Sequence, residues 1–269
     1  MTMNIKILFF GDVIGKLGRR AIAKVLPALK KKYKPDLVIA NVENIAHGAG
    51  ITKTTLEEIK SAGVEFFTSG NHVFDKSEVL QILADPSVPL LRPANYLPGT
   101  PGQGYRVIQL GKHKILVINL MGRVFMRENL DCPFRTADNI LSQFKNEKLS
   151  AIIVDFHAET TSEKIALSWY LNGRVSLVVG THSHVPTADA KISDQGTAML
   201  SDAGMNGGRD TVIGANKEAV IEYFLTQLPA HFDYPESGVA TTNALFTEID
   251  PRTAQAKKVE LIQTEINIQ

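Results

Sequence analysis

Short apolar runs alternate with amphipathic stretches along about two thirds of this 269-residue chain. The first run, Ile5 to Phe10, predicts a buried strand, and Arg19 to Lys32 carries apolar residues at helical spacing. The succession repeats with a strand at Leu37 to Val42 and a helix at Thr52 to Ala62, which Thr52 would cap. Such alternation predicts a layered α/β fold with a largely parallel sheet.

The later segments continue this pattern and then depart from it. Further strands are expected at 65–69, 151–156, 176–179 and 197–200, and further helices at 76–83, 162–171 and 216–225. A hairpin is expected at 105–120, and the tail segments 240–249 and 257–268 alternate apolar and polar residues like an antiparallel pair. Because no repeat or linker divides the chain, we expect one domain over residues 1–269 that contains two sheets.

Composition excludes several classes of protein. Apolar residues make up 44% of the chain and charged residues 21%, which excludes global disorder. A net charge of +1 gives no overall attraction to nucleic acid or anionic membrane, although it leaves a local basic patch open. The one cysteine, Cys132, excludes an intramolecular disulfide and a thiolate-rich zinc site. The N-terminal apolar run is too short to span a membrane, so we expect a cytoplasmic protein.

Polar residues that commonly bind metals follow five of the predicted strands. They are Asp12, Glu43 with Asn44, Asn71 with His72, His157, and His182 with His184. Each motif alone is common in turns, but ligands in α/β proteins bind beyond the carboxyl ends of the strands. His182 and His184, as alternate residues of an extended segment, would point into one small site. The five motifs together predict a metal site at one end of the sheets.

The number and type of these residues suggest two metal ions. A mononuclear catalytic zinc takes three protein ligands, whereas two metals that share a carboxylate form the clamp used for displacement at phosphorus. The oxygen and nitrogen donors suit manganese, iron, zinc or magnesium. Two divalent ions with Asp12 and Glu43 leave a charge of about +2, which a bridging hydroxide lowers to about +1. That charge complements a phosphodiester monoanion.

The motifs resemble those of the calcineurin-like metallophosphoesterases, and within them those of the bacterial YmdB-type subfamily. The resemblance rests on Gly11 to Gly15, Asn41 to Gly48, Gly70-Asn71-His72, Asp155 to Glu159 and Gly180 to Asp189. Most of the superfamily has a histidine where this chain has Ile14, and bridges its metals with aspartate rather than a glutamate such as Glu43. Both departures are features of the YmdB-type branch. The resemblance implies a four-layer αββα sandwich, with two mixed β-sheets flanked by helices.

The resemblance also implies a role for each residue of the set. Asp12, Asn44 and His184 would hold one metal, Asn71, His157 and His182 would hold the other, and Glu43 would bridge them. The two ions would be iron or manganese, with zinc or magnesium as alternatives. A hydroxide between the metals would attack phosphorus, and His72 would stabilise charge or protonate the leaving oxygen. The implied activity is hydrolysis of phosphodiesters such as 2′,3′-cyclic nucleotides, which leaves an RNA-related substrate open.

Other functions and several residue roles stay open at this point. A regulatory protein that keeps the metals but acts by binding RNA or protein is the main alternative, and the presence of His72 argues against it. A Ser-His-Asp hydrolase is disfavoured because the chain has no G-x-S-x-G motif. His47 would contact substrate or simply pack, and Asp189 and Asp202 would orient ligand histidines or cap helices. The tail strands could also pair with a second copy of the chain.

Overall fold

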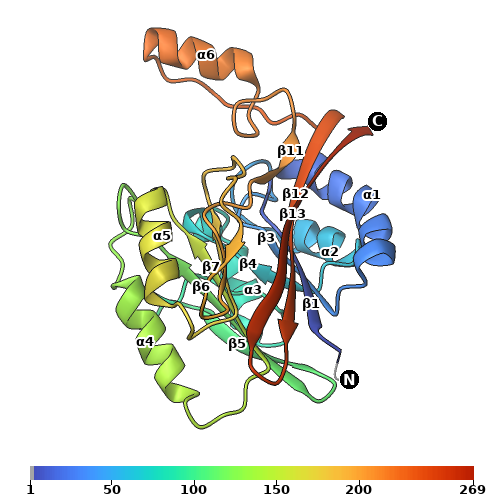
Figure 1. The fold of residues 1–269 in the computed structure, drawn as a ribbon. Coiled ribbons are helices and arrows are strands. Elements are labelled where there is room, and N and C mark those ends of the chain that lie inside the picture. The colour runs from blue at the N-terminus through green and yellow to red at the C-terminus, as the bar shows by residue number, and fades with distance from the viewer. Residues whose placement is uncertain (1–2) are drawn as a thin grey trace.

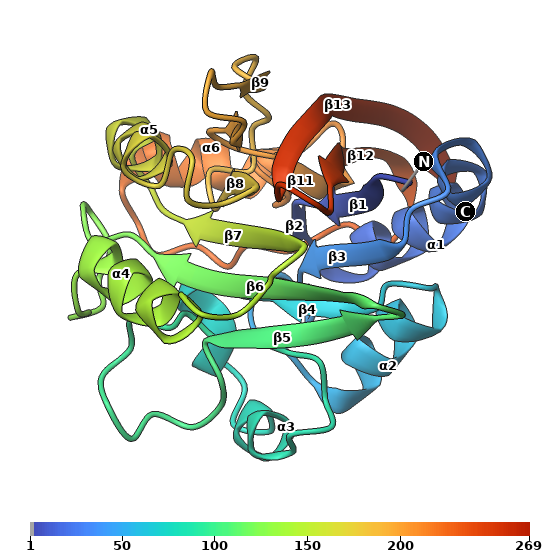
Figure 2. The same ribbon diagram turned by 60° about the horizontal axis from the view of Figure 1, so that its bottom comes forward.

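The computed structural model describes residues 3–269, which form four layers (Figures 1 and 2). Two mixed sheets face each other, and helices cover the outer face of each sheet. The predicted αββα sandwich is therefore confirmed. Within residues 3–269, no helix combines the length and the hydrophobicity needed to cross a bilayer.

The first sheet has seven strands. In spatial order they are β4 (Phe66–Thr68), β3 (Leu37–Asn41), β1 (Ile5–Phe10), β12 (Gly238–Asp250), β11 (Met205–Gly208) and β2 (Asp12–Val13), with β13 (Gln255–Ile268) paired to β12. The strands β1, β3 and β4 are parallel, whereas β12 runs antiparallel to both β1 and β13. The predicted antiparallel tail pair is confirmed, and its β12 lies inside the sheet because β1 and β11 share one of its edges.

The second sheet has six strands. In spatial order they are β5 (Tyr105–Leu110), β6 (His113–Met121), β7 (Ala151–His157), β8 (Leu177–Thr181), β10 (Ala198–Leu200) and β9 (Lys191–Ile192). The four inner strands are parallel to one another, and the two edge strands are antiparallel to their neighbours. The parallel strands therefore present an aligned carboxyl edge in each sheet: β6, β7, β8 and β10 in this sheet, and β1, β3 and β4 in the first.

The helices divide between the two outer layers. They are α1 (Gly15–Tyr33), α2 (Lys53–Ser61), the 3₁₀ turn η1 (Asn71–Phe74), α3 (Val79–Ala84), α4 (Pro133–Gln143), α5 (Thr161–Tyr170) and α6 (Lys217–Thr226). Helices α1, α2 and α3 pack on the first sheet, and α4 and α5 pack on the second. Helix α6 stands apart from the layers, at the top of Figure 1.

Strand alternation places polar residues at one end of the layer between the sheets. Along β1, Ile7 and Phe9 face the opposite sheet, whereas Leu8 and Phe10 face the helices. Along β3, Ile39 belongs to the same inter-sheet core, and Asn41, two residues later, is buried there as a polar side chain. The carboxyl ends of the strands thus place buried polar side chains next to the predicted metal site.

Some predicted elements differ from the structure. Helix α1 begins at Gly15, four residues before the predicted start at Arg19, and α4 was not predicted. The short strands β2, β9 and β11 were also not predicted, because two to four residues do not display a period. Thr52 caps α2 as expected, in a reciprocal arrangement with Thr55.

Candidate metal centre

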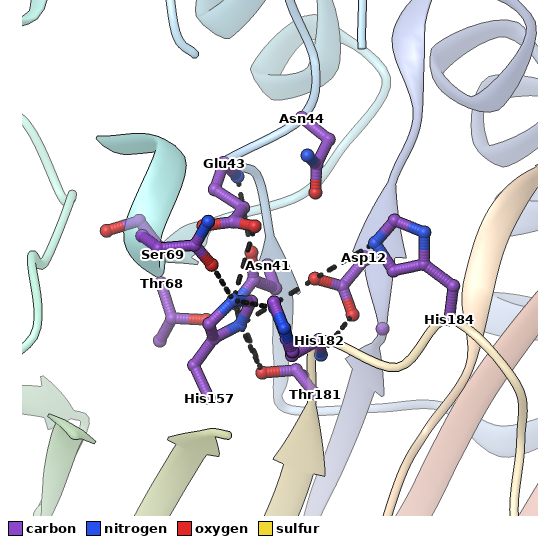
Figure 3. Close-up of polar contacts among 12 residues, drawn as sticks. Asp12, Asn41, Glu43, Asn44, Thr68, Ser69, His157, Thr181, His182 and His184 are labelled. Carbon is purple, nitrogen blue, oxygen red and sulfur yellow. Dashed lines mark hydrogen bonds and ion pairs between the residues drawn. The ribbon is translucent and has the colours of Figure 1, made fainter. Parts of the chain in front are cut away.

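The predicted ligands come together where the carboxyl edges of the two sheets meet (Figure 3). The first sheet contributes Asp12 in β2, Glu43 and Asn44 after β3, and Asn71 in η1 after β4. The second sheet contributes His157 at the end of β7, and His182 and His184 after β8. We refer to these seven residues as the metal centre. All seven residues that the sequence predicted as ligands thus lie at this junction, which makes it a candidate metal site.

Three donor atoms converge around one imidazole nitrogen, that of His157 Nε2. His157 Nε2 lies 3.0 Å from Asn71 Oδ1, 3.0 Å from His182 Nδ1 and 3.2 Å from Glu43 Oε1. The donor atoms of Glu43, His157 and His182 lie within 4.8 Å of one another. With Asn71, they make up the set predicted for the second metal, in which Glu43 is the bridging carboxylate. Their spacing fits ligands of a common cation.

The other half of the centre contains oxygen atoms that lack hydrogen bonds. Within residues 3–269, Asp12 Oδ1 and Asn44 Oδ1 are buried without a hydrogen-bond partner, and so is Glu43 Oε1, which lies between the two halves and faces His157 Nε2 as an ion pair at 3.2 Å. The Asn44 amide donates to the Gly48 carbonyl at 2.9 Å, and His184 Nε2 lies 4.0 Å from Asp12 Oδ1. Buried polar atoms are normally satisfied, so three unsatisfied oxygens in one cluster fit a site built for cations.

Each ligand histidine is held by a hydrogen bond at its outer ring nitrogen. His157 Nδ1 lies 2.9 Å from the Thr181 hydroxyl, which itself donates to Asp155 and therefore accepts from the ring. His184 Nδ1 lies 2.8 Å from the Ile213 carbonyl, and His182 Nε2 lies 2.9 Å from a Glu159 oxygen. These acceptors keep the proton on the outer nitrogen and leave the lone pair of the inner nitrogen for a metal.

Buried carboxylates in the centre favour a positive charge between them. Burial lowers the pKa of His157, but the Glu43 and Asp12 carboxylates outweigh it and raise that pKa to about 9. Burial raises the pKa of Glu43, yet the charge on His157 lowers it to about 2. Burial and then His157 lower the pKa of His182 to about 3. In the metal-free protein, His157 is therefore protonated, and its positive charge partly compensates the carboxylates around it. A bound divalent cation would compensate their charge more completely.

His72 lies at the mouth of the centre rather than among the ligands. Its backbone N–H donates to Glu43 Oε2 at 2.9 Å, and its Nδ1 lies 2.7 Å from Asp75 Oδ2. The side chain borders two cavities, of about 420 Å³ and about 340 Å³. This exposed position suits a group that meets substrate, as expected for His72. Asp75, which orients the ring, was not found from the sequence, because an i,i+3 carboxylate in a turn is a common surface feature.

The backbone at the second-sheet ligands corrects one expectation. His182 and His184 do not lie on an extended segment: their φ angles are 99° and 65°, in a region that residues with a side chain rarely adopt. The two rings therefore reach different parts of the centre, His182 toward His157 and His184 toward Asp12. Such strained backbone is common at functional sites. Gly70 is also required nearby, because a Cβ atom there would overlap the His157 ring.

The three residues with open roles lie around the centre. Asp202 accepts from the backbone N–H and the hydroxyl of Ser183, at 3.0 and 2.7 Å, and from the buried Lys164 at 2.6 Å. It therefore fixes the loop between the two ligand histidines, although its hydrogen bonds go to no imidazole within residues 3–269. Asp189 accepts from Ser201 and from Thr187, two residues before it, and among the described residues it likewise bonds to no imidazole. His47 is exposed, so it does not pack.

Comparison with known proteins places the chain in a family. Residues 8–262 match the model of the YmdB-like protein family. The chain is 44% identical over 258 residues to a Bacillus subtilis protein named 2′,3′-cyclic-nucleotide 2′-phosphodiesterase, with 96% of each chain covered.

Solved structures agree with this family and fold. A crystal structure of a phosphatase from Mycoplasma pneumoniae is 38% identical, with a TM-score of 0.92 over 100% of this chain and 96% of that one. A 5′-nucleotidase precursor from Thermus thermophilus shares the fold at 12% identity, with a TM-score of 0.57 over 98% of this chain and 54% of that chain. The chain therefore belongs to the YmdB-like family and is a hydrolase of the metallophosphoesterase fold.

Proposed function

We propose that this chain is a phosphodiesterase that uses two divalent metal ions and hydrolyses 2′,3′-cyclic nucleotides. The observation that carries the proposal is the convergence of unsatisfied carboxylate and amide oxygens with three imidazole nitrogens at the joined sheet edges. The name of the Bacillus subtilis relative supports the choice of substrate class. A metal-binding protein that regulates by contacting RNA or protein remains the second candidate, and the position of His72 beside the centre favours catalysis over it.

The seven residues of the metal centre would hold the two ions. Asp12, Asn44 and His184 would hold one, Asn71, His157 and His182 the other, and Glu43 both. The donor set of oxygen and nitrogen suits iron or manganese, and also zinc or magnesium. When bound, such ions would activate a water molecule and stabilise negative charge at phosphorus.

His72 would act on the leaving group. Asp75 accepts the Nδ1 proton at 2.7 Å, so the opposite nitrogen, Nε2, is available to a substrate. A protonated His72 can donate from Nε2 to the departing ester oxygen. Before that step, its positive charge favours binding of the anionic phosphate group of the substrate. The hydrogen bond from its backbone N–H to Glu43 fixes His72 relative to the metal centre.

Hydrolysis and metal content measured together test this proposal. Purified protein is assayed with bis-p-nitrophenyl phosphate and 2′,3′-cyclic AMP as isolated, after chelation, and after addition of manganese or iron. We expect activity to disappear on chelation and to return at about two metals per chain. We expect His72→Gln to lower kcat by about 10²- to 10⁴-fold without loss of metal. His231→Gln is the matched control, because that side chain is 89% exposed.

Three results would overturn the proposal in different ways. A protein that takes up no metal would contradict the ligand assignment. A metal-loaded protein that cleaves neither substrate would favour the regulatory alternative. A His72→Gln variant that loses metal along with activity would make His72 a ligand rather than the proton donor.

A further inference from the structure

A cavity of about 420 Å³ extends from the metal centre toward α6, and its two sides differ in chemistry. One side is polar and includes Glu43, Asn44, His182 and His184, with His72 at the edge. The other side is apolar and is lined by Ile213, Val220, Tyr223, Phe224, Phe232 and Tyr234. The volume lies in the range of small-molecule sites, and an apolar wall facing a few polar groups is typical of them.

Two contacts tie the apolar side to the metal ligands. Tyr234 lies over Gly48, where a Cβ atom would overlap its ring, and the Gly48 carbonyl accepts from the Asn44 side chain at 2.9 Å. The Ile213 carbonyl accepts from His184 Nδ1 at 2.8 Å. The apolar side therefore lies at a fixed place relative to the metal centre, although it comes from a segment outside the two sheets.

Aromatic rings on this side are arranged around α6 and the segment after it. The Tyr223 ring lies 5.8 Å from Phe232 at an interplanar angle of 88°, and 5.7 Å from Phe224 at 66°. Within α6, which the structure describes in full, only Val220 is buried, and Phe224 is 68% exposed. Phe224 lines the cavity and leaves most of its ring uncovered, so a flat ligand group could cover it.

The second cavity beside His72 has a different character. It measures about 340 Å³ and shares His72 and His182 with the first. Polar side chains such as Asn71, Asp75 and Arg127 contribute much of its lining. Of the two spaces that flank His72, the one toward α6 therefore suits the flat apolar part of a phosphate ester.

We propose that Tyr223, Phe224, Phe232 and Tyr234, here called the aromatic wall, form a subsite for the base of a nucleotide whose phosphate lies at the metal centre. This subsite proposal rests on the proposed function, and it adds that the site recognises the base of the nucleotide. Stacking on aromatic side chains stabilises bound bases and tolerates different bases, because every base has a π face. Tyrosine hydroxyls are the polar groups of the wall itself, so recognition would depend mainly on the ring faces.

Removal of one ring, with two substrates, tests the subsite. Manganese-loaded wild type and Phe224→Ala are assayed with 2′,3′-cyclic AMP and with methyl riboside 2,3-cyclic phosphate, which keeps the sugar and phosphate but lacks the base. We expect Phe224→Ala to lower kcat/KM for cyclic AMP by about tenfold, mainly through KM, and to leave the base-free substrate unchanged. Leu225→Ala is the matched control, because Leu225 is 80% exposed on the same helix and is not among the residues that line the cavity. Phe224→Tyr, which keeps the ring, should restore the wild-type value.

The remaining outcomes separate the subsite from the proposed function. Equal losses on both substrates, or no loss on either, would overturn the subsite while leaving the diesterase intact. If wild type cleaves neither substrate, the proposed function fails, and calorimetry with adenosine 3′-phosphate and inorganic phosphate decides the subsite. Weaker binding of the nucleotide alone in Phe224→Ala would support the aromatic wall, and unchanged binding would overturn it.

Discussion

At the scale of single residues, the proposed metal binding would depend on side chains that do not touch the metal. The Thr181 hydroxyl lies between the His157 ring and the buried Asp155, and accepts from the first because it donates to the second. Asp155 also accepts from Asn41 at 3.1 Å and from the Thr68 hydroxyl. This buried network fixes the His157 ring with its Nε2 directed into the metal centre.

Replacement of Thr181 by valine should therefore weaken metal binding while keeping the shape of the core. We expect about 10- to 100-fold lower metal affinity, measured by competition with a coloured chelator. Thr247→Val is the matched control, because the Thr247 hydroxyl is buried without a hydrogen-bond partner within residues 3–269 and its loss costs no bond. Equal metal affinity in the two variants would contradict a role for Thr181 in orienting His157.

The charge state of His157 gives the metal affinity a pH dependence. Its pKa is raised to about 9 because the Glu43 and Asp12 carboxylates outweigh the effect of burial. Below that pH the metal-free protein holds a proton on the ring, and a cation must displace it. Apparent metal affinity should therefore rise with pH between about 7 and 9, by roughly tenfold per unit, and then level off. Calorimetry in two buffers of different ionisation enthalpy would measure the released proton, and pH-independent binding would contradict this assignment.

The sequence indicated the ligands better than the residues that support them. Asp12, Glu43 and the histidines were predicted as ligands because they follow strands and match a known motif set, and the structure brings them together. Thr181 and Lys164 were missed, because their roles depend on neighbours that only the packed structure brings close. The aromatic wall was missed for the same reason, since Phe224 follows no strand and matches no motif.

At the scale of elements, patterns in the sequence predicted most of the helices and strands but missed helix α4 and the short strands β2, β9 and β11. The α2 helix and the tail pair β12 and β13 were predicted because a capping threonine or a sustained alternation marks them. Strand β2 has two residues, yet it places Asp12 in the metal centre by pairing with β11 from far along the chain. Such pairing is a property of the tertiary fold, and no local pattern in the sequence encodes it.

The same limit applies to the loop that follows β8. Its composition, Gly180-Thr181-His182-Ser183-His184, predicted metal ligands but also an extended backbone. The structure has left-handed residues there instead, held by Asp202 through Ser183 and by Lys164 through Asp202. A buried ion pair between Lys164 and Asp202 thus stabilises a backbone that local preference disfavours.

At the scale of the whole molecule, the metal centre joins two halves of the fold. The first sheet supplies its ligands from residues 12–71 and the second from residues 157–184. The core between the sheets joins the same halves, because Ile7 and Ile39 belong to one cluster with Ile153 and Val179. We propose on this basis that the chain folds as one domain, with metal binding and sheet packing stabilising the same state.

Metal removal should therefore change the stability of the entire chain in one step. A ligand that binds only the folded state at 100 times its Kd stabilises it by about 2.7 kcal/mol, so we expect metal loading to raise Tm by roughly 5–10 °C. Calorimetry should show one transition with and without metal, and Asp12→Asn, which weakens a ligand at 0% exposure, should reduce the shift. Two separate transitions, with metal affecting one of them, would show instead that the sheets unfold independently and that the ligands do not couple them.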